Sequence, residues 1–265
     1  MTALVRPVTR ADLLAALATL GVELGSTVMV HTALSRLGWV VGGEVTVIDA
    51  LSDAVGPDGT LVMPAQSWQL CDPAFLADPA VPAAWYPTIR EALPAYDPAR
   101  TPTRTMGAVA ELFRSLPGAL RSAHPQRSIS ALGPRAAEVT AVHDVDCAAG
   151  ERSPMRALYD LGGHVLLLGV GFDKCTVLHL AEERTDYPGR RRAAGGGPVL
   201  RDGERVWLEW EELDLLDDDF TELGADYLAS GLPAARGPVG EADAVLVPVR
   251  ELVDFAGEWM AAHRR

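Results

Sequence analysis

Apolar residues recur at helical spacing near the start of the chain and then give way to short apolar runs. The stretch TRADLLAALATLGV has the helical spacing, with Thr9 as a candidate N-cap and Gly21 as a stop signal. The next run, STVMVH at 26–31, is short and apolar, which indicates a buried strand. A helical pattern returns at 44–56 and a strand pattern at 59–64, so this region predicts alternating helices and strands.

Residues 68–105 interrupt the alternation with a segment rich in proline and aromatic side chains. Long segments of this kind inside a compact domain are usually functional or disordered, and the aromatic residues argue against disorder. We therefore expect an irregular insert on the substrate side of the protein.

Helical and strand patterns alternate again after the insert. We expect helices near 107–116, 134–142, 153–162, from about 173, and at 217–229 and 249–263, with strands near 128–132, 164–170 and 244–249. Asp202-Gly203 lies between two β-rich runs, which is a hairpin signature. These elements predict an α/β protein with a mixed sheet, in which the hairpin supplies the antiparallel part. We find no repeat and no linker, and we expect one domain over 1–265.

Composition and charge narrow the possible partners. The 265 residues are 48% hydrophobic, enough for a sizeable core, and the formal net charge is −13. Such an acidic chain is poorly suited to nucleic acid or an anionic membrane, and suits a cationic ligand better. No apolar run approaches the roughly 20 residues that cross a bilayer, and no secretion signal is evident. Three cysteines without CxxC spacing indicate free thiols, so we expect a cytoplasmic protein.

The residues best suited to acid–base chemistry lie in VLLLGVGFDKCTVLHLAEERTDYP. If a helix begins near Asp173, then His179, Glu182 and Glu183 share one face at i, i+3 and i+4. A carboxylate on one imidazole nitrogen fixes the tautomer and raises the basicity of the other nitrogen, as a general base requires. Such pairs are also common on solvated surface helices. The preceding loop GVGFD follows a strand, where α/β sheets bind ligands, and this favours a reactive pair.

Other loops also offer ligand contacts. VMVHTALSRLGWVVGG, at 28–43, presents backbone N–H groups, hydroxyls and Arg36, which suit a diphosphate or an ordinary turn. YDPARTPTRTMGAV, at 96–109, and RSAHPQRSISALGP, at 121–134, place Thr, Ser, Arg or His in proline-bent backbone. The acidic run from Glu209 to Asp226 is typical of a solvated helix face, and would contact the substrate if that substrate is cationic.

Two further chemistries find little support. A metal site would need His31, Asp97 or His124 as a further ligand, and neither HExxH nor CxxC spacing is present, so we expect no metal. A serine nucleophile would need a G-x-S-x-G elbow, which is lacking.

Six motifs occur in the order seen in aminoglycoside 3-N-acetyltransferases, and the chain resembles that family from about residue 9 to residue 263. They are VMVHTALSRLGWVVGG, GPDGTLVMP, YDPARTPTRTMGAV, RSAHPQRSISALGP, ERSPMRALYDLGGHVLLLGVGFDKCTVLHLAEER and GPVGEADAVLVPVRELVDFAGEW. The form CTVLHLAE is similar to the actinobacterial-type branch. The resemblance implies acetyl transfer from acetyl-CoA to the 3-amino group of the 2-deoxystreptamine ring of an aminoglycoside antibiotic, conferring resistance. It also implies a three-layer α/β/α fold around a mixed sheet, distinct from the common N-acetyltransferase (GNAT) superfamily.

The resemblance also implies roles for individual residues. In the family the histidine of HLAE is the catalytic base and its glutamate the orienting partner, here His179 and Glu182; Thr176 is a candidate oxyanion donor. The residues implied for the coenzyme are His31, Thr32, Ser35, Arg36, Leu37, Gly38, Thr103, Arg104, Met106 and Ser122. The residues assigned to the cationic antibiotic are Asp97, Tyr96, Gln66, Glu212, Asp217 and Glu222.

Two other functions stay open at this point. One is an acetyltransferase of the same fold that acts on another amine metabolite, and the other is a non-catalytic CoA-binding protein. The sequence is compatible with either a monomer or a homodimer.

Overall fold

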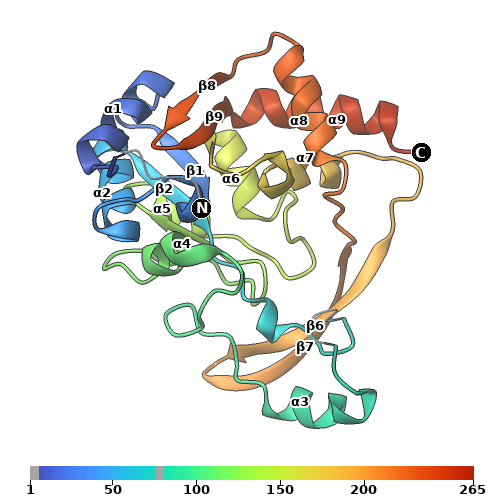
Figure 1. The fold of residues 1–265 in the computed structure, drawn as a ribbon. Helices are drawn as coiled ribbons and strands as arrows, with labels where there is room; N and C mark the ends of the chain where they lie inside the picture. Colours follow the sequence, from blue (N-terminus) through green and yellow to red (C-terminus); the bar gives the residue numbers. More distant parts are fainter. Residues whose placement is uncertain (1–5, 76–79) are drawn as a thin grey trace.

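The computed structural model of the protein describes residues 6–75 and 80–265 (Figure 1). Its strands are β1 (Thr27–Thr32), β2 (Thr60–Pro64), β3 (Leu120–Arg121), β4 (Ile129–Leu132), β5 (His164–Leu168), β6 (Arg192–Arg201), β7 (Glu204–Leu213), β8 (Ala235–Val239) and β9 (Ala242–Pro248). Its α-helices are α1 (Arg10–Leu20), α2 (Gly43–Val55), α3 (Tyr86–Ala92), α4 (Gly107–Arg114), α5 (Ala136–Thr140), α6 (Pro154–Asp160), α7 (Leu178–Arg184), α8 (Phe220–Ala229) and α9 (Val249–His263). Within these two ranges, no helix is long and apolar enough to cross a membrane.

Seven strands form one mixed sheet in the order β3-β4-β2-β1-β5-β9-β8. The central strands β2, β1 and β5 are parallel, whereas β3, β4, β9 and β8 pair antiparallel with their neighbours. Alternate residues of a strand face opposite sides of a sheet. In β1, Val28 and Val30 accordingly join one hydrophobic core, and Met29 joins the other. The sheet is therefore buried on both faces.

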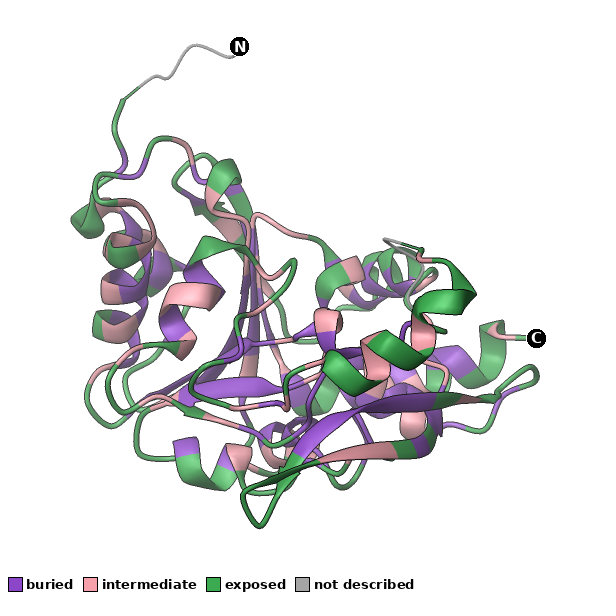
Figure 2. Cartoon of the chain, turned by 90° about the horizontal axis from the view of Figure 1, so that it is seen from below, coloured by how far each residue is buried: buried purple, intermediate pink, exposed green. Residues whose placement is uncertain are grey.

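Helices cover both faces of this sheet. Helices α1, α2 and α4 pack on one face, in the core that contains Leu17, Leu51 and Phe113. Helices α5 to α9 contribute to the core on the other face, which contains Leu180 and Trp259. Figure 2 shows buried strands between helices whose outward faces are exposed. The predicted three-layer α/β/α fold around a mixed sheet is confirmed.

The β6–β7 hairpin forms a separate two-stranded sheet. The prediction that it supplies the antiparallel part of the main sheet is wrong, because its strands pair only with each other along their whole length. The hairpin extends away from the layers and lies over the insert (Figure 1). There the backbone N–H of Asp72 donates to the carbonyl of Gly196 at 2.9 Å, and that of Tyr96 donates to the carbonyl of Pro198 at 2.9 Å.

The insert at 68–105 is more regular than expected. It contains α3 and two short 3-10 turns, at Trp68–Leu70 and Ala83–Trp85. The buried carboxylate of Asp72 accepts hydrogen bonds from Arg90 at 2.9 and 3.0 Å, which ties the start of the insert to α3. The insert and the hairpin therefore hold each other in place below the main sheet.

The ends of α1 match the prediction, whereas the two edge strands, β3 and β8, were not predicted. Thr9 accepts a hydrogen bond from the backbone of Asp12, whose side chain accepts one from the backbone of Thr9, and Gly21 ends the helix at φ 94°. Strand β8 has the sequence ARGPV, and glycine and proline are depleted in strands. Because it lies at an edge of the sheet, it tolerates the proline.

Candidate active site

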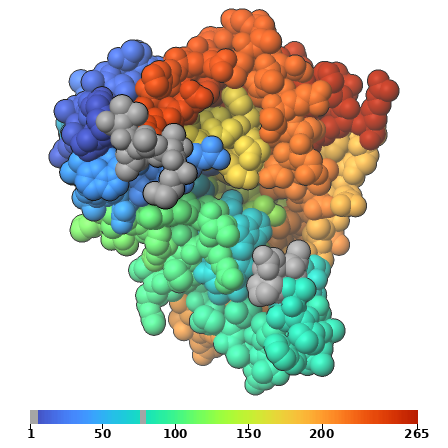
Figure 3. All heavy atoms as spheres, viewed as in Figure 1, coloured from blue at the N-terminus to red at the C-terminus, as the bar shows by residue number. Residues whose placement is uncertain are grey.

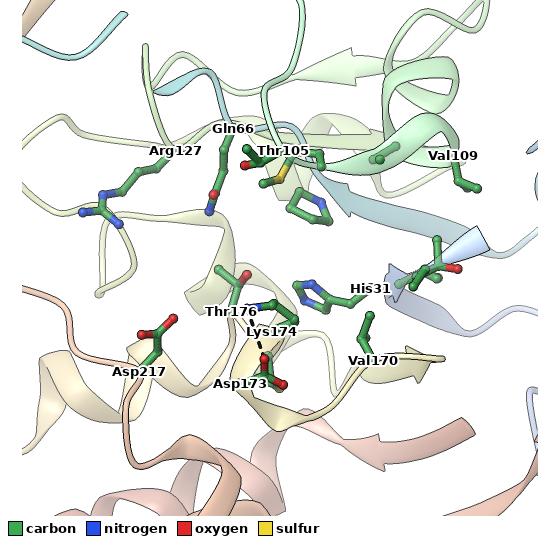
Figure 4. Close-up of a pocket in the computed structure, with 18 of the residues that line it drawn as sticks. His31, Gln66, Thr105, Val109, Arg127, Val170, Asp173, Lys174, Thr176 and Asp217 are labelled. Carbon is green, nitrogen blue, oxygen red and sulfur yellow. Dashed lines mark ion pairs between the residues drawn. The ribbon is translucent and has the colours of Figure 1, made fainter. Parts of the chain in front are cut away.

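The carboxyl ends of β1, β2 and β5 open onto one pocket of about 830 Å³. Thr32, Pro64 and Val170, at or just after these ends, are part of its wall. Open α/β sheets bind ligands at this edge. Residues from α4, α7 and the loop before α8 complete the wall (Figure 4). The face seen in Figure 3 is hollowed near its centre, where green, yellow and orange segments meet.

His179 lies in the first turn of α7 and in the pocket wall. Helix α7 begins at Leu178 and follows a separate 3-10 turn at Phe172–Lys174, so the expected helix start near Asp173 is wrong. The two are separated because Cys175 has a non-helical backbone, with φ −81° and ψ 86°. The three-residue spacing of His179 and Glu182 is preserved, since both lie within α7.

The imidazole of His179 is bonded to Glu182 through one nitrogen. Its Nδ1 lies 2.8 Å from Oε2 of Glu182, and its ring lies 4.9 Å from the ring of Phe220. An ionised carboxylate can only accept, so Nδ1 carries the proton and Nε2 carries the lone pair. The His179 side chain is 15% exposed, so a ligand in the pocket can reach this nitrogen.

Glu182 is fully buried, and four donors bond to its carboxylate. Besides His179 on Oε2, Oε1 accepts from the Tyr187 hydroxyl at 3.0 Å, the Leu216 backbone N–H at 2.9 Å and Arg264 at 2.7 Å. Burial alone would raise the pKa of Glu182, but the hydrogen bond and charge of His179, helped by Leu216 and Arg264, lower it. The carboxylate therefore stays ionised at neutral pH.

Glu183 does not share this arrangement. It is half-buried, and its Oε2 lies 3.6 Å from the guanidinium of Arg190. Burial raises the pKa of Glu183, and it is not part of the pocket wall. The geometry therefore separates the two glutamates, which the sequence pattern alone places on the same helical face.

Several residues assigned to the coenzyme meet in the pocket wall, namely His31, Thr32, Ser35 and Met106. Nε2 of His31 and Oγ1 of Thr32 are buried and have no hydrogen-bond partner within the described ranges. Because buried polar atoms are normally bonded, these two are available to a ligand. Burial, and then the charge of His179, lower the pKa of His31 to about 4, so its ring is neutral at pH 7.

Arg36, Leu37 and Gly38 lie outside this pocket. Arg36 borders a second hollow of about 540 Å³, which shares Val170 and Lys174 with the first. Leu37 is fully buried in the core. A Cβ atom at Gly38 would come within 2.7 Å of the Glu241 side chain, and its φ is +85°, so glycine is required there by the turn.

Ser122 also lies away from the pocket. Its hydroxyl lies 2.8 Å from Nδ1 of His143 and accepts a hydrogen bond from the backbone of Ile129 at 2.9 Å. Nε2 of His143 donates to the carbonyl of Ala148 at 2.8 Å. The Ser122 side chain is therefore engaged inside the fold.

Thr103 and Arg104 stabilise the pocket wall through hydrogen bonds of their backbone N–H groups. The N–H of Thr103 donates to Glu111 at 2.7 Å, and that of Arg104 donates to the carbonyl of Gln66 at 2.8 Å. These bonds fix the loop that carries Thr105 and Met106 into the pocket wall. Thr105 has a φ of 65°, which is strained for a β-branched residue. Strain of this kind is typical of ligand-binding segments.

Thr176 and Lys174 face the pocket from the segment before α7. The carbonyl of Thr176 accepts the backbone N–H of His179 at 3.2 Å, which sets Thr176 one turn before the histidine. The ammonium of Lys174 lies 3.1 Å from the carboxylate of Asp173. Lys174 therefore adds a partly balanced positive charge to this side of the pocket.

Gln66 and Asp217, both assigned to the antibiotic, are in the pocket wall. Oε1 of Gln66 accepts from the Trp68 ring N–H at 2.9 Å, and the amide nitrogen of Gln66 points into the pocket (Figure 4). Arg127 is also in the wall, with its guanidinium 4.7 Å from the centre of the Trp68 ring. One end of the pocket thus combines an amide, a carboxylate, a guanidinium and an indole.

The other residues assigned to the antibiotic are engaged elsewhere. Tyr96 is buried and donates to the carbonyl of Ser122 at 2.7 Å. Oδ1 of Asp97 accepts from two backbone N–H groups of the following turn, at 2.9 and 3.2 Å. Glu212 is buried 3.5 Å from Arg127, and Glu222 is exposed on α8. None of these four side chains lies in the pocket wall as the described residues define it.

The sequence reasoning missed Tyr187, Leu216 and Arg264, which provide three of the four donors to Glu182. Arg264 is 82 residues from Glu182, and no spacing signal connects them. Arg127 lies within the motif RSAHPQRSISALGP. A positive charge in this proline-bent loop was the signal that could have identified it as a pocket residue. In the described part of the chain, no three His, Cys, Asp or Glu side chains form a group suited to a metal ion.

Comparison with known proteins connects this site to one family. The profile of the family described as aminoglycoside 3-N-acetyltransferase matches residues 29–261. Over 254 residues, the chain is 42% identical to the SPbeta prophage-derived aminoglycoside N(3')-acetyltransferase-like protein YokD of Bacillus subtilis, covering 96% of this chain and 92% of that protein. The crystal structure of YokD has a TM-score of 0.94 and covers 97% of this chain and 95% of that one.

Two other similar proteins connect the chain to the same family. Aminoglycoside N(3)-acetyltransferase VII of Streptomyces paromomycinus is 41% identical, over 96% of this chain and 92% of that protein. A structure described as AAC-IIIb binary with CoASH has a TM-score of 0.88 at 36% identity, with 98% of each chain covered. Both the family profile and the identities extend over nearly the whole chain. The protein therefore belongs to the aminoglycoside 3-N-acetyltransferase family.

Proposed function

We propose that the protein transfers an acetyl group from acetyl-CoA to the 3-amino group of the 2-deoxystreptamine ring of an aminoglycoside, with His179 as general base. The observation that carries this proposal is the His179–Glu182 pair in the wall of the large pocket. Membership of the family supports it, and so does the CoASH held by the AAC-IIIb relative.

The chemistry requires a base because an amine is mostly an ammonium at pH 7 and attacks only after it loses a proton. Nε2 of His179 accepts that proton, and the carboxylate of Glu182 stabilises the resulting imidazolium through Nδ1–H. The Thr176 hydroxyl is a candidate donor to the carbonyl oxygen that gains negative charge. As the C–N bond forms, the C–S bond of the thioester breaks; CoA leaves as a thiolate and becomes the free thiol by taking a proton from the imidazolium.

Two observations support a coenzyme site at the ends of β1 and β5. The unpaired buried atoms of His31 and Thr32 fit a chain that offers amide groups. The second hollow brings Arg36 and Lys174 together beside the pocket; these cations suit a diphosphate, although the carboxylates of Asp173, Glu241 and Asp243 share the same wall. Ser35 and Met106 would line the path between them.

The end of the pocket that contains Gln66, Asp217 and Phe220 is the proposed acceptor site. Figure 4 shows Gln66, Arg127 and Asp217 at one end of the pocket and Val109 and Val170 at the other. The carboxylate of Asp217 would attract an ammonium group, and a charge-assisted hydrogen bond contributes about 1.5 to 3 kcal/mol. An acceptor amine bound there lies in the pocket whose wall contains His179 and Thr176.

Arg127 favours a second class of acceptor. Its guanidinium faces the same end of the pocket as Asp217, so the site is less acidic than a polycationic antibiotic would best suit. An amine that carries fewer positive charges, or an anionic group beside the amine, would match this pair of charges better. The second candidate function is therefore acetyl transfer to another amine metabolite.

One assay separates these functions. Purified protein and acetyl-CoA are incubated with a panel of deoxystreptamine antibiotics and a panel of amines with one or no net positive charge, and free thiol release is followed. Thiol release with the antibiotics, with the acetyl group located on the 3-amino nitrogen by NMR, supports the first proposal. Release only with the less cationic amines supports the second. Tight CoA binding without release from any acceptor contradicts both proposals and favours a non-catalytic CoA-binding protein.

A further inference from the structure

A guanidinium from outside α7 completes the hydrogen bonding of Glu182. Arg264 directly follows α9, and its side chain is 8% exposed. Its Nη1 donates to Glu182 at 2.7 Å, while Nε and Nη2 donate to the two carboxylate oxygens of Asp219 at 2.8 Å each. Nη2 also donates to the carbonyl of Leu216 at 3.0 Å. The planar group is thus fixed on three sides, as the fork geometry of arginine allows.

Two aromatic rings hold the same guanidinium between them. Its central carbon lies 4.9 Å from the centre of the Tyr187 ring and 5.9 Å from that of Phe220. Tyr187 is itself a donor to Glu182, and Phe220 packs against the ring of His179. Arg264 therefore contacts Glu182, its donor Tyr187, and Phe220, which packs against His179.

The charge of Arg264 matters because the other three donors to Glu182 do not carry a permanent positive charge. When His179 is neutral, Glu182 is a fully buried carboxylate, and burying such a charge without a counter-charge is strongly unfavourable. Arg264 supplies that counter-charge in both protonation states of His179. Through Asp219 and Leu216 it also fixes the loop that presents Asp217 to the pocket.

We propose that Arg264 is a positioning residue for the acetyl transfer. It keeps Glu182 ionised and fixes the direction of its carboxylate, so that Nδ1–H of His179 stays bonded and Nε2 stays turned toward the acceptor. This inference rests on the proposed function, since it assigns Arg264 a part in the reaction through His179.

The test compares Arg264→Ala with Arg250→Ala. Both residues belong to the α9 segment, and Arg250 also bonds backbone carbonyls and lies over an aromatic ring, that of Tyr159, but it does not contact the pair. We expect Arg264→Ala to lower kcat about 10- to 100-fold, with the KM for either substrate changed less than about threefold, because misplacement of a catalytic group acts on turnover. Millimolar guanidinium chloride should restore part of the lost kcat, and sodium chloride at equal ionic strength should not.

A second readout does not depend on acetyl transfer. In protein with 15N-labelled histidine, the Nδ1–H proton of His179 should give a downfield, slowly exchanging signal, because Glu182 accepts it. We expect Arg264→Ala to lose this signal and Arg250→Ala to keep it. If the wild-type protein transfers no acetyl group, the proposed function fails, and this signal still decides whether Arg264 positions the pair.

The milder Arg264→Lys variant keeps the positive charge but loses the planar, forked arrangement of donors. It tests the proposal even if Arg264→Ala does not fold. We expect it to have a kcat between those of the wild type and Arg264→Ala, without rescue by guanidinium. A wild-type kcat in Arg264→Ala, an unchanged Nδ1–H signal, or equal losses in Arg250→Ala would each overturn the proposal.

Discussion

Two histidine–glutamate pairs in the described part of the chain differ in how completely their atoms are bonded. In the pair of His179 and Glu182, the carboxylate has four donors and one imidazole nitrogen faces the pocket. In the pair of His124 and Glu212, Nε2 and Oε2 lie 4.0 Å apart, and both atoms lack a hydrogen-bond partner within the described ranges. The second pair joins the loop before β4 to β7 of the hairpin.

The difference appears in the charge of each pair. Burial lowers the pKa of His124 well below its usual value, so this imidazole is neutral at pH 7, and burial raises the pKa of Glu212. Glu182 is equally buried, yet its donors hold it ionised. A reactive pair therefore needs a carboxylate whose charge is stabilised by further hydrogen-bond donors, and an imidazole that faces a cavity. A short distance between the two residues is not enough.

The largest effect should come from His179→Ala. We expect kcat to fall about 10²- to 10⁴-fold, the usual contribution of a general base, with coenzyme affinity nearly intact because Glu182 and the loop after β1 are unchanged. Steady-state kinetics and calorimetric titration with CoA measure the two quantities. A variant that retains more than about a tenth of the wild-type rate would show that another group takes the proton.

The same substitution in the other pair, His124→Ala, should lower the free energy of unfolding rather than the turnover rate. Nδ1 of His124 accepts from the backbone of Gln126 at 3.2 Å and of Arg127 at 3.1 Å, and its ring packs 4.9 Å from that of His143. Losing this acceptor and leaving a cavity should cost about 2 to 4 kcal/mol of unfolding free energy, measured by urea denaturation. The kcat of the folded variant should stay within about tenfold of wild type. A kcat as low as that of His179→Ala would erase the distinction between the pairs.

Acid should destabilise the protein through the buried imidazoles beside the second pair. Burial lowers the pKa of His143 from 6.5 to about 4. Because the folded pKa is below the unfolded one, the unfolded state takes up more protons between these values, and stability falls as the pH falls through this window. The contribution of His143 is at most about 3 kcal/mol, and it is fully present above pH 6.5. The free energy of unfolding, obtained from denaturation curves at several pH values, should fall less steeply with falling pH in His143→Asn than in the wild type. An unchanged pH dependence would contradict this assignment.

Glu182→Gln should lower kcat about 10- to 100-fold, less than His179→Ala. The amide oxygen can still accept from Nδ1–H of His179, but the amide nitrogen then meets the three donors that now bond Oε1. Turnover at saturating substrate is the measurement. If this variant were slower than His179→Ala, the carboxylate would have a direct chemical role.

The smallest effect should come from Glu183→Gln, which is the matched control for the neighbouring glutamate. Its carboxylate faces Arg190 at 3.6 Å, outside the pocket wall, and we expect kcat to change less than about twofold. Should this substitution cost more turnover than Glu182→Gln, the choice of partner for His179 would be wrong.

Local patterns in the sequence were sufficient for most of the helices, for the central strands and for the His179–Glu182 spacing, but not for α3 or for the start of α7. Helical periodicity acts within a few residues, so α1, which also has an N-cap signal, and α9 could be placed from local sequence alone. The position of the β6–β7 hairpin could not be predicted, because its contacts with the insert join residues such as Asp72 and Gly196, far apart in sequence.

The surroundings of the site were less predictable for the same reason. Acidic composition does not show which side chain turns inward: Asp217 lies in the pocket wall, Glu212 in β7 is buried beside His124, and Glu222 is exposed. Arg264 reaches Glu182 only after α7 and α9 pack together. Such long-range contacts leave no periodic signal in the chain.

The burial of His31 determines whether its imidazole can act as a base in the pocket. Two imidazoles lie in the pocket wall, but desolvation keeps His31 neutral down to about pH 4. Above that pH His31 takes up no proton, so it adds no charge beside the acetyl group and leaves the acceptor's proton to another base in the pocket.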